Sequence, residues 1–468
     1  MACQCKKLMA ALLVTGALAG SAMSADITQA MAQIAQQHAN SLAVFRGTVT
    51  NEFGKGEVAG PAVCISTEPA VFISLALDAR VRPENLSDFR LTPAGQGGAE
   101  IKAELLGIDP EMNVTFIKAV DPHPWTAVQF ARASSLAYGQ PVVSIGLWPA
   151  DTGYQTYLGL GYVGSFLRVP EQQVYVTGGN LTNVGTPVFN LDGVAIGIVG
   201  AQRFMNYQTM LNGQATNLGL KSQQQGLFFL PVEEFVHMLE NIPASPTQVR
   251  RLAWLGVLDL STVSKEIADV MKLDRPGVMI DQVVPNQAAD KAGLQNRDVI
   301  VAVNGQPLEK LATSDLTTLN LDRKMTRFRP GQQITLTVVR GQETREATVT
   351  LDPFPMREEE AARHLDRKLG MLLREKIPMD QYLRLSASAN VPGLVVALVA
   401  QDGPASKGGV QPYDLIAAVN NQPVQSIDGY KQIEPTLPAD QPINFLIRRG
   451  DMDMTVTVQP AAPPAGGQ

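Results

Sequence analysis

Short apolar runs separated by Gly, Pro, Asn and Asp fill the chain from about residue 41 to residue 229. Runs of this length without long helices between them predict strands of a barrel or sandwich. Before them, Ile27, Met31, Ile34 and Ala35 share one face of a predicted amphipathic helix. After them, residues 231–241 predict a closing helix. The predicted strands are 42–50, 62–66, 70–75, 101–107, 114–119, 142–146, 174–177, 188–190 and 194–199.

The remaining chain contains a two-copy repeat with a constant offset of 116 residues. Two copies of this size indicate tandem domains rather than a solenoid, whose shorter units come in threes or more. Each copy continues with a short predicted helix, 314–321 or 427–434, and then a pair of strands. A charged segment between the copies, 354–366, is predicted to be a helical connector. The repeated residues include Gly277, Gly293, Asp298 and Asn304, which recur as Gly393, Gly409, Asp414 and Asn420.

The first residues have the pattern of a secretory signal. Lys6 and Lys7 precede an apolar run over 8–20, and small residues follow. We predict a signal peptide over 1–24, cleaved between Ala22 and Ala25; the alternative is an uncleaved membrane anchor. Cleavage would remove Cys3 and Cys5 and leave Cys64 alone, so the exported protein would have no internal disulfide.

Charge and composition exclude several classes of function. The chain has 44 acidic and 38 basic residues, a net charge of −6, and lacks the basic patch of a nucleic-acid binder. Four histidines and three cysteines are too scattered for a zinc or haem motif. No cofactor and no metal are therefore expected.

The repeated pattern resembles a bacterial PDZ domain: a glycine before a strand, then Ala-x-x-Ala-Gly-Leu, then Asp-Val-Ile-x-x-Val-Asn-Gly. This resemblance implies that each copy binds a free chain end by strand addition, with backbone N–H groups holding the carboxylate. Arg250, Arg251, Arg367 and Lys368 lie beside the matching loops, either to attract that carboxylate or as solvated surface. The residues implied to bind it are Trp254, Leu255, Gly256 and Val257 in the first copy, and Leu369, Gly370 and Met371 in the second.

The β-rich domain resembles the HtrA/Deg family of trypsin-like serine proteases. The matching segments are Gly107-Ile-Asp-Pro-Glu-Met-Asn113, Gly139-Gln-Pro-Val-Val-Ser-Ile-Gly146, and the stretch from Asn180 to Ile198. The resemblance implies a mainly β fold, a trypsin-like double β-barrel followed by two PDZ domains. The expected boundaries are 25–245 for the barrels with their N-terminal helix, 250–353 and 367–460 for the PDZ domains, and 461–468 for a flexible tail.

The three positions of the catalytic triad are substituted. The motif places Val184 at the serine position and Asn113 at the aspartate position, and the histidine position falls near Ala76. No histidine occurs from residue 39 to 122, so this conclusion does not depend on the register. Thr186 replaces a glycine of the same loop. Neither valine nor alanine can transfer a proton or attack a carbonyl, and asparagine cannot supply the anion that stabilises an imidazolium.

We therefore interpret the chain as an exported pseudoprotease, in a bacterial periplasm, that binds peptides or unfolded proteins as a scaffold or adaptor. The expected partners are C-terminal or extended peptides of exported proteins. We also expect the chain to form a homo-oligomer, which the resemblance implies is a trimer. Two alternatives stay open: a serine-type endopeptidase with a noncanonical site, and a regulatory subunit of an active relative. Cys64, apolar on both sides, is interpreted as a core residue rather than a reactive thiol.

Overall fold

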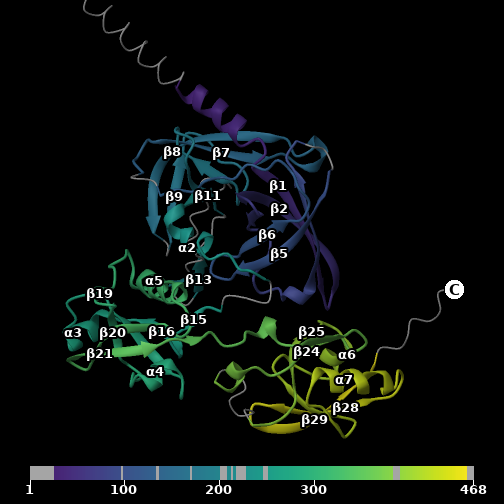
Figure 1. Ribbon diagram of the computed structural model, residues 1–468. Coiled ribbons are helices and arrows are strands. Elements are labelled where there is room, and N and C mark those ends of the chain that lie inside the picture. The colour runs from purple at the N-terminus through teal and green to yellow at the C-terminus, as the bar shows by residue number, and fades with distance from the viewer. Residues whose placement is uncertain are drawn as a thin grey trace, which may run out of the picture. The chain divides into compact units, whose positions relative to one another are not determined.

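The structure is a computed structural model that describes residues 26–95, 99–132, 136–168, 171–200, 208–211, 214–217, 228–245, 251–382 and 390–460. The described part is dominated by strands, which form two closed barrels and two smaller PDZ sheets (Figure 1). The mainly β fold predicted from the sequence is confirmed. The predicted signal peptide, the tail after residue 460 and Arg250 lie outside the described residues. Within the described ranges, no helix is long and apolar enough to cross a bilayer.

The first barrel closes in the order β1-β2-β3-β6-β5-β4. A helix over 26–37 precedes it and buries Ala30 and Ile34, while Met31 packs against the same core. The apolar face predicted for this helix is therefore covered by the chain's own core. The strands are β1 (Leu42–Asn51), β2 (Gly54–Thr67), β3 (Ala70–Ser74), β4 (Leu86–Pro93), β5 (Ile101–Asp109) and β6 (Val114–Ala119), with a 3-10 turn η1 (Pro83–Asn85) before β4.

The second barrel closes in the order β10-β11-β14-β9-β8-β7. The helix predicted over 231–241 is shorter and broken, because Phe235 leaves helical backbone angles between a 3-10 turn η3 (Val232–Glu234) and helix α2 (Val236–Leu239). The other elements are β7 (Pro141–Leu147), η2 (Ala150–Thr152), β8 (Thr156–Arg168), β9 (Gln172–Thr177), β10 (Pro187–Phe189), β11 (Ala195–Val199), a separate hairpin of β12 (Gln208–Leu211) and β13 (Gln214–Asn217), and β14 (Phe228–Pro231).

The first PDZ domain has a sheet in the order β16-β17-β18-β20-β21, and β15 pairs with β22. Helix α5 (Ser314–Arg327) is longer than the predicted 314–321, because the buried Met325 continues its core face and the next breaker is Pro330. The remaining elements are β15 (Ala253–Trp254), β16 (Val257–Thr262), α3 (Lys265–Met271), β17 (Val278–Val283), α4 (Ala288–Lys291), β18 (Val299–Val303), β19 (Gln306–Pro307), β20 (Gln333–Arg340), β21 (Glu343–Thr350) and β22 (Asp352–Pro353).

The second PDZ domain has a sheet in the order β23-β24-β25-β26-β28-β29. Its elements are η4 (Glu358–Glu360), β23 (Arg363–Asp366), β24 (Met371–Arg374), η5 (Pro378–Gln381), β25 (Leu394–Val399), α6 (Pro404–Lys407), β26 (Leu415–Val419), β27 (Gln422–Pro423), α7 (Ile427–Ile433), η7 (Glu434–Thr436), β28 (Ile443–Arg449) and β29 (Met452–Val458). The helical connector predicted over 354–366 is wrong. Pairing of β23 with β24 overrides the helical preference of its charged residues, and only one 3-10 turn remains.

The sequence repeat reflects a buried ion pair that occurs in both PDZ domains. Asp298 is fully buried, and its two carboxylate oxygens accept from Arg340 Nε and Nη2 at 2.7 Å each. Arg340 also donates to the carbonyl of Gly293 at 2.8 Å. Asp414, Arg449 and Gly409 make the same three contacts in the second copy. In each domain, the repeated Asp and Gly thus connect the turn after the short helix to an arginine of the sheet.

Cys64 is fully buried in β2, and burial raises the pKa of its thiol to about 11. The ordinary pKa of a cysteine thiol is 9.0, so the thiolate fraction of Cys64 at pH 8 is about a hundredfold lower in the folded protein than in the unfolded chain. We therefore expect N-ethylmaleimide to modify Cys64 at least a hundredfold more slowly in the folded protein than in urea. Mass spectrometry of a form that begins at Ala25, which lacks Cys3 and Cys5, measures the rate. Equal rates in the folded and unfolded protein would show that Cys64 is accessible.

Candidate functional site

A cavity of about 250 Å³ lies where residues of both barrels meet. It brings together Asn113 and Val184, two of the three positions at which the family resemblance places the triad. Ala76 does not line it: its methyl group faces β2, where a Cβ built on Gly60 would lie 2.8 Å away. Leu75 enters the cavity instead. The lining residues are Leu75, Met112, Asn113, Glu171, Gln173, Val184 and Leu230.

The side chain of Asn113 is engaged in a structural contact. Asn113 lies in the turn between β5 and β6 with a left-handed backbone, φ 57°. Its Oδ1 accepts from the N–H of Ala79 at 3.1 Å, which ties the segment after β3 to this turn. An amide oxygen in this position fixes the loop and carries no charge.

The loop around Val184 is held by its own hydrogen bonds. The N–H of Thr182 donates to Ser144 Oγ at 2.9 Å, and the buried hydroxyls of Thr182 and Thr186 lie 2.8 Å apart. Asn183 accepts from the N–H of Leu147 at 2.7 Å through its side chain and from the Thr186 hydroxyl at 2.6 Å through its carbonyl. The two threonine hydroxyls are therefore part of a structural network, and the cavity side of the loop presents the aliphatic Val184.

The histidines make contacts that the sequence did not predict. His237 in α2 has its Nε2 2.9 Å from Glu111 Oε2, and Glu111 adjoins the cavity-lining Met112. His38 lies 3.0 Å from Ser41 Oγ and stacks on Phe189, and burial lowers its pKa. Ser41 is fully buried, so this pair has no access to a substrate. None of the described residues that line the cavity is a histidine.

A second cavity, of about 400 Å³, lies between β16 and α5 of the first PDZ domain. The predicted residues Trp254, Leu255 and Val257 line it. On α5, Leu316 is buried in the core, whereas Leu319 is 40% exposed and forms a wall of this groove. Sequence periodicity cannot separate the two roles, because both positions belong to the apolar side of α5. The main lining residues are Trp254, Leu255, Val257, Leu258, Asp259, Leu260, Thr318, Leu319, Asp322, Met325 and Thr326.

The loop at the end of this groove has its carbonyl groups turned inward. The Leu255 carbonyl accepts from Ala289 N–H at 2.8 Å, and the Gly256 carbonyl accepts from Val284 N–H at 3.0 Å. The C=O and N–H of a trans peptide point in opposite directions, so the N–H groups of Gly256 and Val257 face away from the domain interior. Gly256 has φ +82°, and an added Cβ would lie 2.7 Å from Gln287 Cβ, so only glycine fits. Two outward N–H groups are what a terminal carboxylate needs.

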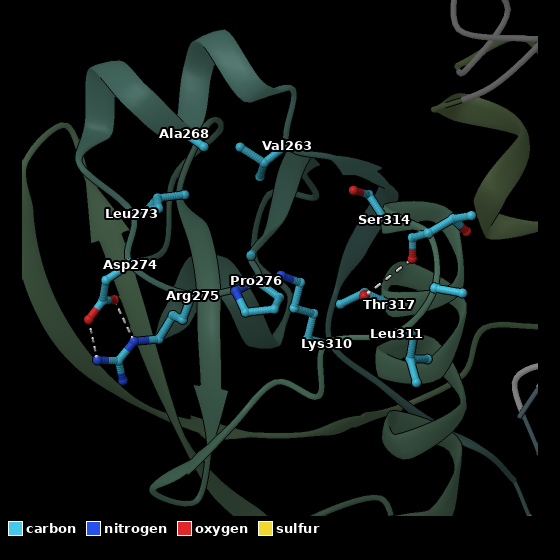
Figure 2. A pocket seen from close by; sticks show the side chains of 13 residues that line it. Val263, Ala268, Leu273, Asp274, Arg275, Pro276, Lys310, Leu311, Ser314 and Thr317 are labelled. Carbon is cyan, nitrogen blue, oxygen red and sulfur yellow. Dashed lines mark hydrogen bonds and ion pairs between the residues drawn. The ribbon is translucent and has the colours of Figure 1, made fainter.

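A separate hollow of about 440 Å³ lies beside the segment that follows β16 and the start of α5 (Figure 2). Val263 follows β16 there, and Thr313, Ser314 and Thr317 belong to the start of α5. Arg275 and Asp274 form an ion pair at this hollow, with a closest distance of 2.7 Å. Figure 2 shows this pair, and Lys310 beside Pro276. A peptide that follows β16 from the carboxylate loop would extend toward this hollow.

The matching loop of the second PDZ domain is arranged differently. Its carbonyls of Leu369 and Gly370 also turn inward, to the N–H groups of Ala405 and Ala400. The N–H of Leu369 donates to Asp366 Oδ1 at 2.9 Å, and the N–H of Gly370 donates to the Asp366 carbonyl at 2.8 Å. Two N–H groups predicted to hold a peptide carboxylate are therefore occupied by Asp366, while Met371 begins β24.

Among the described residues, no group of three His, Cys, Asp or Glu side chains is placed to hold a metal ion.

The family model of a trypsin-like peptidase domain matches residues 70–198, and that of a PDZ domain matches residues 260–351 and 369–459.

The chain is similar to two relatives named "Probable periplasmic serine endoprotease DegP-like". The protein of Ectopseudomonas mendocina (strain ymp) is 28% identical over 362 residues, which cover 75% of this chain and 70% of that relative. The protein of Hahella chejuensis (strain KCTC 2396) is 27% identical over 366 residues, 75% of this chain and 71% of the relative. A solved structure, "HtrA-type protease AlgW with tripeptide", has a similar fold with a TM-score of 0.50 and 21% identity, covering 70% of this chain and 98% of that one. The chain belongs to the HtrA/Deg family, with a trypsin-like peptidase domain followed by two PDZ domains.

Proposed function

We propose that this chain is a pseudoprotease of the HtrA/Deg family that binds chain ends of exported proteins and acts as a scaffold or adaptor. The observation that carries this proposal is the cavity of the barrels, where Val184, Asn113 and Leu75 meet at the place of a triad. A valine side chain has no atom that can attack a peptide carbonyl, and none of the described lining residues is a serine, threonine, cysteine or histidine. Hydrolysis by a triad needs all three groups.

The first PDZ domain supports the binding half of the proposal. Strand β16 is the edge strand of its sheet, and no described strand pairs with its outer edge. The groove beside it is apolar at Leu258, Leu319 and Met325, and ends at the outward N–H groups of the loop. An extended peptide can add to this edge by main-chain hydrogen bonds and place apolar side chains in the groove.

The place of action that we propose is the periplasm, which the names of the relatives and the predicted signal peptide support. A homo-oligomer remains a proposal from the resemblance alone. The apolar face of the N-terminal helix packs against the core of the barrels and therefore gives no argument for association. Light scattering of the purified protein tests association.

A peptide with a free carboxylate is expected to bind the first PDZ domain about 5- to 150-fold more tightly than the same peptide amidated. Amidation leaves the outward N–H groups without their charged acceptor, a loss of about 1–3 kcal/mol. The measurement is fluorescence anisotropy on the full chain, with a labelled decapeptide that ends in Ser-Leu-Leu.

A matched pair of variants assigns this binding to the groove. Leu319→Glu puts a charge into the apolar wall and should weaken the acid peptide at least tenfold, whereas Val270→Glu, at a 71% exposed position of α3, should leave binding unchanged. Equal affinity of acid and amide peptides would contradict recognition of a chain end.

A further inference from the structure

The edge strand of the second PDZ sheet is covered by a segment of the same chain. Strand β23 pairs antiparallel with β24 along its whole length, from Arg363 opposite Arg374 to Asp366 opposite Met371. In the first domain the strand before the loop, β15, pairs with β22, and β16 stays at the edge. The two domains therefore share their topology but differ at the edge where a peptide would add.

Strand β23 runs in the direction that a bound chain end would take. A peptide on this edge pairs antiparallel with β24 and ends at the loop of Leu369 and Gly370. Asp366 is the last residue of β23, lies at that loop and is 1% exposed. Its Oδ1 accepts from Leu369 N–H at 2.9 Å, and its backbone carbonyl accepts from Gly370 N–H at 2.8 Å. Asp366 thus supplies two oxygens to the N–H groups that a terminal carboxylate would use.

The opposite wall of the groove also contacts β23. Tyr430, fully buried in α7, donates its hydroxyl to Asp366 Oδ2 at 2.6 Å. Burial and the nearby Asp366 carboxylate raise the pKa of Tyr430, which keeps the hydroxyl protonated as a donor. His364 lies two residues before Asp366, on the same face of the strand, and its Nε2 lies 2.6 Å from Glu434 Oε2 just after α7. Side chains of β23 therefore contact the α7 side of the groove as those of a ligand would.

We propose that the second PDZ domain holds residues 361–366 of its own chain as a built-in ligand, with Asp366 in the role of a terminal carboxylate. The inference rests on the proposed function only in treating a PDZ groove as a peptide site. A ligand joined to its loop by Arg367 and Lys368 has an effective concentration of the order of millimolar. A tethered segment with an intrinsic dissociation constant of about 10 µM would weaken the binding of a free peptide about a hundredfold. The second domain admits an external chain end only when β23 is released.

Hydrogen exchange of the full chain tests the occupancy directly. The backbone amides of β24 are expected to exchange as slowly as those of the core strand β26 in the unmodified protein. Saturation with the Ser-Leu-Leu decapeptide should slow exchange in β16 and leave β24 unchanged. Slowing of β24 by the peptide in the unmodified protein, or exchange of β24 as fast as a solvent-exposed edge, would overturn the proposal. Absence of slowing in β16 would count against the proposed function of the first domain instead.

A substitution of the built-in carboxylate tests its role. Asp366→Ala is expected to speed exchange of Leu369, Gly370 and β24 at least tenfold. A synthetic peptide of residues 357–366 with a free terminal carboxylate should then bind α7, mapped by photo-crosslinking, at least tenfold more tightly than in the unmodified chain. Asp428→Ala is the matched control, because Asp428 lies on α7 with a 90% exposed side chain.

Exchange in β28 and β29 checks that the domain is folded in each variant. Asp366→Asn, which keeps the shape and removes the charge, replaces the alanine variant if those strands lose protection. A folded Asp366 variant with unchanged exchange at β24 and no gain in peptide binding would show that β23 is ordinary sheet structure and not a ligand.

Discussion

Casein is expected to remain intact, and a serine-reactive phosphonate unincorporated, when either is incubated with the purified chain. Loss of the nucleophile or the histidine of a triad costs about 10⁶ in kcat. Neither group is among the described residues that line the cavity of the barrels. The hydroxyls of Thr182 and Thr186 are 2.8 Å from each other, and no histidine is among the described residues that line the cavity. Gel analysis and mass spectrometry measure the two results. Stoichiometric labelling of any residue from Thr177 to Asn190 would contradict the pseudoprotease proposal.

Restoring the triad is the control for this expectation. Val184→Ser and Asn113→Asp can be combined with histidine at Leu75, Ala76 or Leu77 in turn, which covers the register. We expect each triple variant to remain at least about 10²-fold below an active relative. Trypsin-like enzymes stabilise the oxyanion with the N–H of the nucleophile and of the residue two before it. Here that second N–H, of Thr182, donates to Ser144. Removal of one such donor costs about 10²–10³ in kcat.

The family and the order of domains could be predicted because turn residues and apolar alternation are local signals. Gly256 is an example. Its φ is +82° and a Cβ added to it would lie 2.7 Å from Gln287 Cβ, so only glycine fits, and the glycine of the motif therefore predicts the loop conformation. Asp298 and Asp414 were visible as repeat residues, although their ion pairs with Arg340 and Arg449 were not. Pairing across 35 or 42 residues has no local pattern in the sequence.

The features that the sequence did not reveal depend on contacts between distant residues. Strand β23 was predicted as helix, because its charged residues favour helix and its pairing with β24 is decided by tertiary structure. The contact of His237 with Glu111 joins residues 126 positions apart, and no motif predicts it. Leu75, rather than Ala76, lines the cavity, because alternation along an extended segment reverses with a shift of one residue.

The difference between the two PDZ domains gives the scaffold proposal a specific form. One groove has an unpaired edge strand, β16, and the other has its edge strand paired with β23. Two open grooves would allow a chain to bind two ends at once. In this proposal, one open and one occupied groove would make the first domain the site of initial capture, and the second would become available only to a ligand that displaces Asp366.

Arg374→Ala is expected to destabilise the second PDZ domain by about 3–5 kcal/mol. Arg374 lies in β24 with 1% exposure, and its two terminal nitrogens donate to the Asp380 carboxylate at 2.8 and 2.7 Å. Removing the guanidinium leaves Asp380 as a buried carboxylate without its cation, and that uncompensated charge carries most of the cost. Besides the two contacts with Arg374, the Asp380 carboxylate accepts a hydrogen bond from the N–H of Ile377 at 2.8 Å, and this bond would remain in the variant. Hydrogen exchange of β28 and β29 in increasing urea measures the change.

The double variant Arg374→Met, Asp380→Leu separates the cost of an unpaired charge from the value of the pair. Replacing both partners by apolar groups of similar volume removes the buried charge altogether, so we expect the double variant to be more stable than Arg374→Ala by at least 2 kcal/mol. Arg345→Ala, which breaks the exposed pair with Glu343, should change little. A double variant as unstable as Arg374→Ala would mean that the guanidinium stabilises β24 by its own packing and its contact with the Glu375 carbonyl at 3.1 Å, not by neutralising Asp380.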